Sequence, residues 1–276
     1  MSITVGQAVL LGILQGLTEF LPVSSTAHLA LAQSLIPGFS QPGILFDVLL
    51  HLGTLVAVVA YFRGRIGETA SGLVAADSAE RRAAWKLVAL LVFAVGLTGA
   101  VALPLRKLAV STMSDMRMIG ASLCGTALLL SAAQAVGRRR GAAGRALPEV
   151  RFRDAALVGV CQAASAVFHG FSRSGNTISV GLFSGMSRQT AAEFSFLLSI
   201  PTILAAAASE NLSAYRHHPE AFGAGAWPVY LVGMAVAAVV GYAAIAALLR
   251  LVVSMRLVPF IAYTGLLGLF LLVRSA

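Results

Sequence analysis

Long runs of apolar residues constrain this chain more than any other feature. Six runs are long enough to cross, or nearly cross, the roughly 30 Å hydrocarbon core of a bilayer. They lie near residues 45–62, 84–103, 116–136, 190–208, 227–249 and 257–274. Their residues do not alternate between apolar and polar, as the strands of an outer-membrane barrel do. The sequence therefore predicts an all-α integral membrane protein with six transmembrane helices.

Composition supports this class and argues against others. Hydrophobic residues make up 58% of the 276 residues and charged residues only 11%, which is too little polar surface for a soluble protein of this size. The formal net charge is +9, but no basic stripe carries interleaved aromatic residues, so we expect no nucleic-acid partner. We interpret residues 1–276 as a single membrane domain.

Two further segments, 3–35 and 154–187, are apolar but interrupted by proline, glycine, hydroxyl and charged residues. A straight lipid-facing helix would not carry Glu19, Pro22 and His28 near its middle. A re-entrant hairpin of two half-helices would, provided that its broken tip is buried in protein. We therefore predict two re-entrant helical hairpins in addition to the six spans.

The two hairpin segments resemble each other. At an offset of 147 residues the matching pairs are Gly12 and Gly159, Gln15 and Gln162, Thr18 and Ser165, and Ser25 and Ser172. One residue later in register, FDVLLHLGTLVA matches FSFLLSIPTILA. We interpret residues 1–136 and 150–276 as duplicated repeats, each holding one hairpin and three spans. An odd number of spans inverts the second repeat, so the hairpin tips should meet near the midplane.

Basic residues are distributed unevenly between the two sides of this topology. The loops at 63–86, 137–153, 187–189 and 250–256 carry most of the arginines, whereas the other side has only Arg106, Lys107, Arg117, Arg216 and Arg274. The positive-inside rule places the first set of loops in the cytoplasm and both termini outside.

Ionisable groups at membrane depth are costly, so each is a functional candidate. Glu19 and His28 belong to the first hairpin, and Arg173 lies at the tip of the second. Hydroxyl groups surround them, namely Ser24, Ser25 and Thr26 on one tip and Ser172, Ser174 and Thr177 on the other. Two helix N-termini facing one cavity would bind an anion, and the planar arginine fork suits phosphate oxygens. The set predicts a phosphate or diphosphate site.

The nucleophile is left open between two residues. Ser25 and His28 are three apart and share a helix face, so Ser25 could attack phosphorus with His28 or Glu19 as its base. Alternatively, His28 attacks and Glu19 orients its ring. A structural interpretation is that the hydroxyl groups only cap broken helices while Glu19 and Arg173 form a buried tie. His51 corresponds to Ser199 in the other repeat, which favours a packing role over a proton relay.

The stretches GLTEFLPVSSTAHL and GFSRSGNT, the latter followed by EFSFLLSIPT, resemble the two signature regions of the bacterial undecaprenyl-diphosphate phosphatase (bacitracin-resistance) family. The resemblance extends over the whole chain. It implies a homodimeric inner-membrane enzyme that hydrolyses undecaprenyl diphosphate to the monophosphate at the outer face, which recycles the lipid carrier for cell-wall synthesis. The implied site residues are Gln15, Glu19, Ser24, Ser25, Thr26, His28, Ser172, Arg173, Ser174 and Thr177.

Two residues depart from the family pattern. Gln15 stands where the family often has glutamate, so a second carboxylate that would hold a divalent ion is missing. His169 stands where the family usually has proline. We expect no protein metal cluster, and the sequence leaves open a divalent cation, Mg²⁺ or Ca²⁺, as cofactor.

Two other functions compete with the hydrolase. Paired hairpins in an inverted repeat also suit a transporter or flippase for a polyprenyl phosphate. A weaker alternative is a lipid-binding scaffold without catalysis, which the number of polar groups at depth disfavours. A carrier needs the anion site but no nucleophile with a base, so the Glu19, Ser25 and His28 set discriminates between them.

Overall fold

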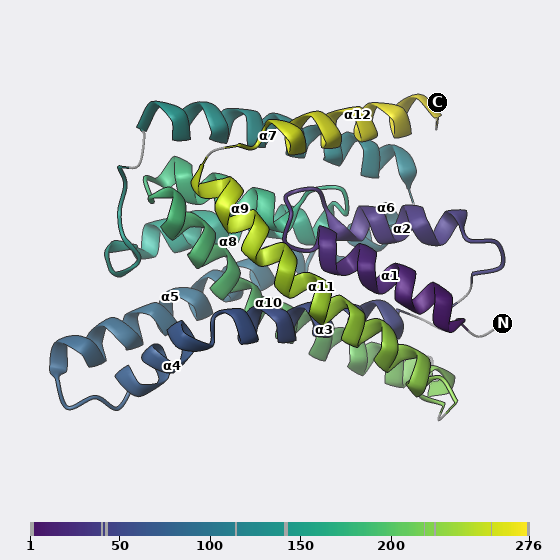
Figure 1. The fold of residues 1–276 in the computed structure, drawn as a ribbon, viewed down its shortest axis with the longest axis horizontal. Coiled ribbons are helices and arrows are strands. Elements are labelled where there is room, and N and C mark those ends of the chain that lie inside the picture. The colour runs from purple at the N-terminus through teal and green to yellow at the C-terminus, as the bar shows by residue number, and fades with distance from the viewer. Residues whose placement is uncertain are drawn as a thin grey trace.

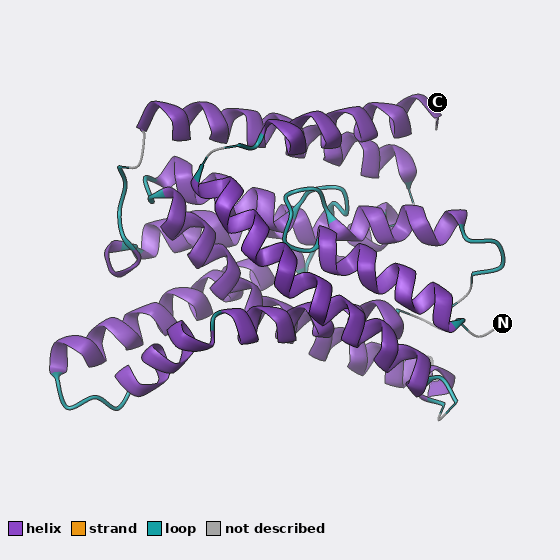
Figure 2. Ribbon diagram, viewed as in Figure 1, coloured by secondary structure: helices purple, strands orange, loops and turns teal. Residues whose placement is uncertain are grey.

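The computed structural model describes residues 3–39, 41, 44–113, 115–140, 143–217, 219–223, 225–254 and 256–274. These residues form twelve α-helices (Figure 2). They are α1 (Val5–Thr18), α2 (Ser25–Leu35), α3 (Leu45–Tyr61), α4 (Arg63–Gly72), α5 (Ser78–Ala102), α6 (Arg106–Thr112), α7 (Met116–Arg140), α8 (Phe152–Val167), α9 (Arg173–Ser184), α10 (Arg188–His217), α11 (Trp227–Val253) and α12 (Val258–Arg274). Two short 3₁₀ segments, Leu147–Glu149 and Pro219–Phe222, complete the secondary structure.

The predicted membrane class is confirmed. Helices α5, α7, α10 and α11 are each long and apolar enough to cross a bilayer. A fifth candidate is the pair α3 and α4, which bends by 70° at the break between them. Large apolar side chains remain exposed on the outer helices, for example Leu128 at 74%, Val239 at 73% and Leu266 at 69%. Such a surface suits contact with lipid rather than water.

Two segments predicted as loops contain helices. The segment 63–86 holds α4 and the first turns of α5, where Asp77 caps the new helix by accepting from the Ala79 N–H. The segment between α5 and α7 holds the short helix α6. Neither segment has the apolar run on which the prediction of spans depended. The predicted span at 257–274 corresponds to α12, which is apolar but has only 17 residues.

The long helices lie at different inclinations around a central pair of hairpins (Figure 1). Helices α7 and α12 pack together along one edge, and α5 and α4 lie toward the opposite edge. Helix α11 crosses the middle of the molecule and contacts α1, α3 and α10. The largest buried cluster includes Phe20, Phe194 and Phe196 and also takes in residues of α8 and α9.

Helices α1 and α2 form the first predicted hairpin, and α8 and α9 form the second. Their bounds agree with the predicted segments, 3–35 and 154–187, to within a few residues. In Figure 1 the two hairpins enter from opposite ends of the molecule and their connecting turns meet near its centre. Polar residues from two distant parts of the chain are thereby brought together.

Glycines allow the long helices to approach the hairpins and one another closely, as small residues do in membrane proteins. A Cβ atom built on Gly53 of α3 would lie 2.2 Å from the Met234 carbonyl oxygen of α11. One built on Gly159 of α8 would lie 2.4 Å from the Ala94 carbonyl oxygen of α5. These distances leave no room for a methyl group without a movement of backbone.

We predict that Gly53→Ala destabilises the protein by about 1–3 kcal/mol, because overpacking a tight helix contact forces the backbones apart. The matched control is Gly99→Ala on α5, where an added Cβ meets nothing within 4 Å. Thermal unfolding in detergent, followed by circular dichroism, measures the difference. Equal unfolding temperatures for the two variants would contradict the close contact between α3 and α11.

Candidate active site

The first hairpin turns at a strained serine. Ser24 is the N-cap of α2 and has φ 69° and ψ 96°, a backbone conformation that residues other than glycine rarely adopt. Its Oγ accepts from the Ala27 N–H and donates to the His169 carbonyl at 2.5 Å. Thr26 Oγ1 donates to the same carbonyl at 2.6 Å. The second hairpin therefore holds the first tip in this conformation, as is typical of strained residues at functional sites.

The second hairpin turns in a similar way. Ser172 is the N-cap of α9, and its Oγ accepts from the Gly175 N–H at 3.2 Å. The Ser172 N–H donates to Thr126 Oγ1 of α7 at 3.0 Å, and Ser174 Oγ donates to the Leu21 carbonyl of the first tip at 3.2 Å. A serine therefore caps the helix that begins at each tip, and each tip satisfies polar groups of the other.

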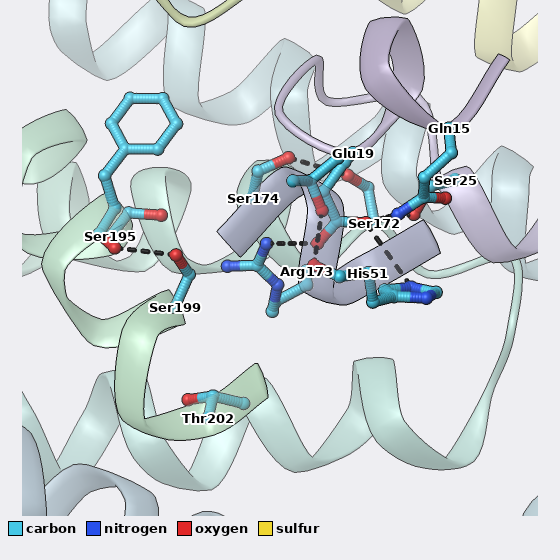
Figure 3. Close-up of polar contacts among 12 residues, drawn as sticks. Gln15, Glu19, Ser25, His51, Ser172, Arg173, Ser174, Ser195, Ser199 and Thr202 are labelled. Atoms are coloured by element: carbon cyan, nitrogen blue, oxygen red, sulfur yellow. Dashed lines mark hydrogen bonds and ion pairs between the residues drawn. The ribbon is translucent and has the colours of Figure 1, made fainter. Parts of the chain in front are cut away.

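Glu19 is the centre of the polar cluster (Figure 3). Its carboxylate is buried and accepts from Ser25 Oγ at 2.6 Å, Gln15 Nε2 at 3.0 Å and Arg173 Nη2 at 2.7 Å. His51 Nε2 lies 3.5 Å from the same carboxylate. The structure therefore brings together four predicted site residues, Gln15, Glu19, Ser25 and Arg173, and adds His51 to them.

His28 lies one turn beyond Ser24 and bonds elsewhere. Its Nδ1 lies 2.7 Å from the Ser24 carbonyl oxygen, and its Nε2 lies 2.8 Å from the Tyr263 hydroxyl of α12. The two rings are stacked, with centroids 5.6 Å apart. Although His28 and Ser25 lie on one short helix, the hydroxyl of Ser25 bonds to Glu19 and not to the imidazole.

Thr177 lies one turn into α9, where its Oγ1 bonds to Ser195 Oγ of α10 at 2.5 Å and to the Arg173 carbonyl at 2.9 Å. Helix α10 thereby supports the helix turn that carries Arg173. The His169 side chain lies 3.4 Å from Thr112 Oγ1 through its Nδ1, while its carbonyl supports the first tip.

The cluster offers oxygen ligands to a divalent cation. Glu19 supplies a carboxylate, and the neighbouring Gln15 Oε1 is buried and accepts no hydrogen bond from any residue that the structure describes. The described residues contain no group of three or more His, Cys, Asp or Glu residues placed to hold a metal. Magnesium is typically bound by one or two carboxylates together with substrate phosphates, so the residues fit a cation that a phosphate helps to hold.

The arrangement has two chemical capacities. A serine hydroxyl 2.6 Å from a buried carboxylate is the geometry of a nucleophile with its base. The N-termini of α2 and α9, together with the guanidinium of Arg173, favour an anion. Both capacities meet within one buried cluster between the hairpin tips.

Sequence reasoning did not select three of these residues for the site. His51 was expected to pack because its counterpart in the other repeat is the neutral Ser199, whereas the structure places its Nε2 3.5 Å from the Glu19 carboxylate. Ser195 lies in the stretch EFSFLLSIPT, which begins 16 residues after the end of the second motif. Tyr263 gave no signal, because it lies in a long apolar helix 235 residues from its partner, His28.

Comparisons with known proteins identify the family. The model of the family described as "Bacitracin resistance protein BacA" matches residues 8–270. A protein named undecaprenyl-diphosphatase from Syntrophotalea carbinolica is 41% identical over 95% of each chain. A protein of the same name from Geobacter metallireducens is 40% identical over 95% of this chain and 94% of its own length. Another from Gemmatimonas aurantiaca is 41% identical over 96% of each chain. On these matches, the chain belongs to the BacA family of bacitracin resistance proteins.

Proposed function

We propose that this protein is a membrane phosphatase that hydrolyses undecaprenyl diphosphate to undecaprenyl phosphate and inorganic phosphate, and that this activity confers bacitracin resistance. Relatives named undecaprenyl-diphosphatase match nearly the whole chain. The observation that carries the proposal is the 2.6 Å hydrogen bond from Ser25 to Glu19 beside Arg173. A polyprenyl-phosphate transporter would need the anion site but no such pair, so this contact favours the hydrolase.

The terminal phosphoryl group of the substrate would bind between the hairpin tips. Arg173 would present a planar fork to its oxygens, and the N-termini of α2 and α9, which begin at the two tips, would add backbone N–H groups. Gln15 orients Glu19, while the remaining predicted binding residues shape and support the tips. These are Ser24, Thr26, Ser172, Ser174 and Thr177.

The reaction would proceed in two displacements. Ser25 Oγ attacks the terminal phosphorus as Glu19 accepts the hydroxyl proton, and the bond from phosphorus to the bridging oxygen breaks. Undecaprenyl phosphate leaves with the electron pair, and Glu19 gives up its proton to solvent and returns to the carboxylate. Water, deprotonated by Glu19, then attacks the phosphoserine. The bond from phosphorus to Ser25 Oγ breaks, Glu19 returns the proton to Ser25 Oγ, and inorganic phosphate is released. The transition state is loose, so positioning and charge stabilisation by Arg173 and the helix N-termini supply most of the rate.

Two alternative roles for His28 can be distinguished by experiment. As a proton-transfer group, it would protonate the leaving phosphate, with Tyr263 fixing the ring through the 2.8 Å hydrogen bond. As the nucleophile, it would replace Ser25 and form a phosphohistidine. The direct Ser25–Glu19 hydrogen bond supports the first role.

A divalent cation is compatible with the same site. Glu19 and Gln15 would hold it, and it would supply positive charge that offsets the charge of the diphosphate.

We also propose six spans and two re-entrant hairpins related by an inverted repeat, with repeats at 1–136 and 150–276. The pattern of helix contacts supports this, because α1 packs on α11 as α8 packs on α5. The matched glycines behave alike, since a Cβ on Gly12 would lie 2.6 Å from the Gly233 carbonyl oxygen and one on Gly159 would lie 2.4 Å from the Ala94 carbonyl oxygen. The N-caps Ser24 and Ser172 are 148 residues apart. The offset between the two repeats therefore changes from 147 to 148 residues before the tips.

The arginine-rich ends of the helices support a cytoplasmic location for the loops near α4, α7 and α9, and an active site open to the outer face of the cytoplasmic membrane. We extend the proposal to a homodimer, as the family resemblance implies.

We predict that Arg173→Ala lowers the rate of phosphate release from undecaprenyl diphosphate by on the order of 10³-fold, because it removes the charge that stabilises the transferring group. Arg173→Lys keeps a partner for Glu19 and should fold normally, but lose about 10²-fold or more because an ammonium lacks the fork. Phosphate release and size-exclusion profiles measure both. Arg82→Ala, an exposed arginine on α5, is the control. Near-native turnover of folded Arg173→Ala would remove Arg173 from the site.

We predict that Ser25→Ala loses several orders of magnitude in activity, whereas His28→Ala loses about 10²–10⁴-fold, as is typical of a lost proton-transfer group. Enzyme quenched during turnover is tested for a phosphorylated adduct. Phosphoserine survives acid and phosphohistidine does not. An acid-labile adduct that persists in Ser25→Ala and vanishes in His28→Ala would make His28 the nucleophile.

We predict opposite labelling of two single cysteines, Ser78→Cys at the start of α5 and Ser111→Cys on α6, in a Cys124→Ala, Cys161→Ala background. Both serines are exposed. An impermeant thiol reagent added to spheroplasts should label position 111 and reach position 78 only after the membrane is opened. The reverse pattern would invert the proposed orientation.

A further inference from the structure

The second hairpin encloses a cavity at the end away from its tip. The cavity has a volume of about 410 Å³ and lies between α8 and the C-terminal half of α9. Its lining includes Arg145, Arg151 and Arg153 together with Asp154. Arg173, which begins α9, is roughly 16 Å from Ser184 at the cavity, as the helical rise of 1.5 Å per residue gives. The cavity is therefore separate from the cluster around Glu19.

Two arginines in this region have structural roles. Arg145 forms a bidentate ion pair with Asp154, at 2.7 and 2.9 Å, and also donates to the Ser184 carbonyl. Arg140 donates to the Leu182 carbonyl at 2.7 Å. Both cap the C-terminal end of α9, where positive charge is favourable. The charge of Arg145 is matched by Asp154.

Arg151 and Arg153 have no such role. Both are exposed, and neither side chain forms a hydrogen bond or ion pair with any residue within the described ranges. The lining has three arginines against one aspartate, a net charge of +2. Orientation of the protein in the membrane would require basic residues on this side, but it would not require them to line a cavity.

The lining of the cavity also has an apolar part. Leu157, one turn beyond Arg153 on α8, belongs to it together with Val180 and Phe183 of α9, and Leu157 and Phe183 are 43% and 37% exposed. An occupant that contacts both the arginines and these apolar residues needs a negative head and an apolar tail. Basic pockets between membrane helices on the cytoplasmic side bind anionic lipid head groups in this way.

We propose that this cavity is a binding site for a lipid that carries a negatively charged phosphate head group, with Arg151 and Arg153 on the head group and Leu157 and Phe183 along the first part of the tail. The chemistry fits an anionic membrane phospholipid and a polyprenyl monophosphate equally. The site is distinct from the proposed catalytic cluster, and its occupant is bound without being hydrolysed.

Native mass spectrometry of the detergent-solubilised protein tests the site, with phosphatidylglycerol, polyprenyl monophosphate and zwitterionic phosphatidylcholine as probes. We expect at least one anionic probe to bind more tightly than phosphatidylcholine. The double variant Arg151→Gln, Arg153→Gln should weaken that binding by about tenfold or more, since each loses a charge-assisted contact. Leu157→Trp, which fills the cavity without a change of charge, should weaken it as well.

The matched control is Arg81→Gln, Arg82→Gln, which removes the same charge from exposed positions on α5. Equal loss in this control would show general attraction to a basic surface and overturn the site, as would equal binding of all three lipids. Tighter binding of phosphatidylglycerol would identify a membrane lipid, and tighter binding of polyprenyl monophosphate a product-like lipid; either supports the site. Arg173→Lys should retain the binding, because the cavity is separate from the cluster around Glu19. The result of this test therefore does not depend on whether the catalytic proposal holds.

Discussion

The ion pair between Glu19 and Arg173 joins two helical hairpins, and neither hairpin could keep its broken conformation without the other. Each hairpin breaks its helix inside the protein, which exposes backbone groups and charges that lipid cannot satisfy. The structure resolves this by reciprocal contacts. Hydroxyl groups of the first tip donate to the His169 carbonyl, and Ser174 of the second donates to the Leu21 carbonyl. Because each tip completes the other, the cluster exists only when both hairpins are in place.

The surrounding helices make this central contact possible. Glycine and other small residues allow α11 to lie against α1 and α3, and α5 to lie against α8, so that the hairpins are clamped from both sides. Apolar side chains on the outer faces remain for lipid. The polar interior and the apolar exterior are thus separated by one layer of closely packed helices. Mutations in that layer should act on the site through the position of the tips.

The sequence was informative at positions where only a few residue types are energetically acceptable. An arginine or glutamate at membrane depth is expensive, so Glu19 and Arg173 were recognisable, and serine at a helix start has a clear capping role. The sequence was less informative about orientation and distant contacts. The spacing of Ser25 and His28 placed them on one helix but could not show that the imidazole bonds to Tyr263. Helices α4 and α6 were missed because they are short or polar and lack a long apolar run.

The same ion pair has a consequence for selectivity between substrate and product. Glu19 accepts a hydrogen bond from Arg173 Nη2 and therefore competes with any phosphate that approaches the guanidinium. A diphosphate carries more negative charge than a monophosphate and displaces a carboxylate from a guanidinium more effectively. If the protein hydrolyses undecaprenyl diphosphate, the carboxylate that is freed by substrate binding returns to Arg173 once the charge of the bound lipid has fallen. Glu19 would then act as an internal competitor for Arg173 that weakens the binding of the product, so that the lipid phosphate just made is a weak inhibitor of the enzyme.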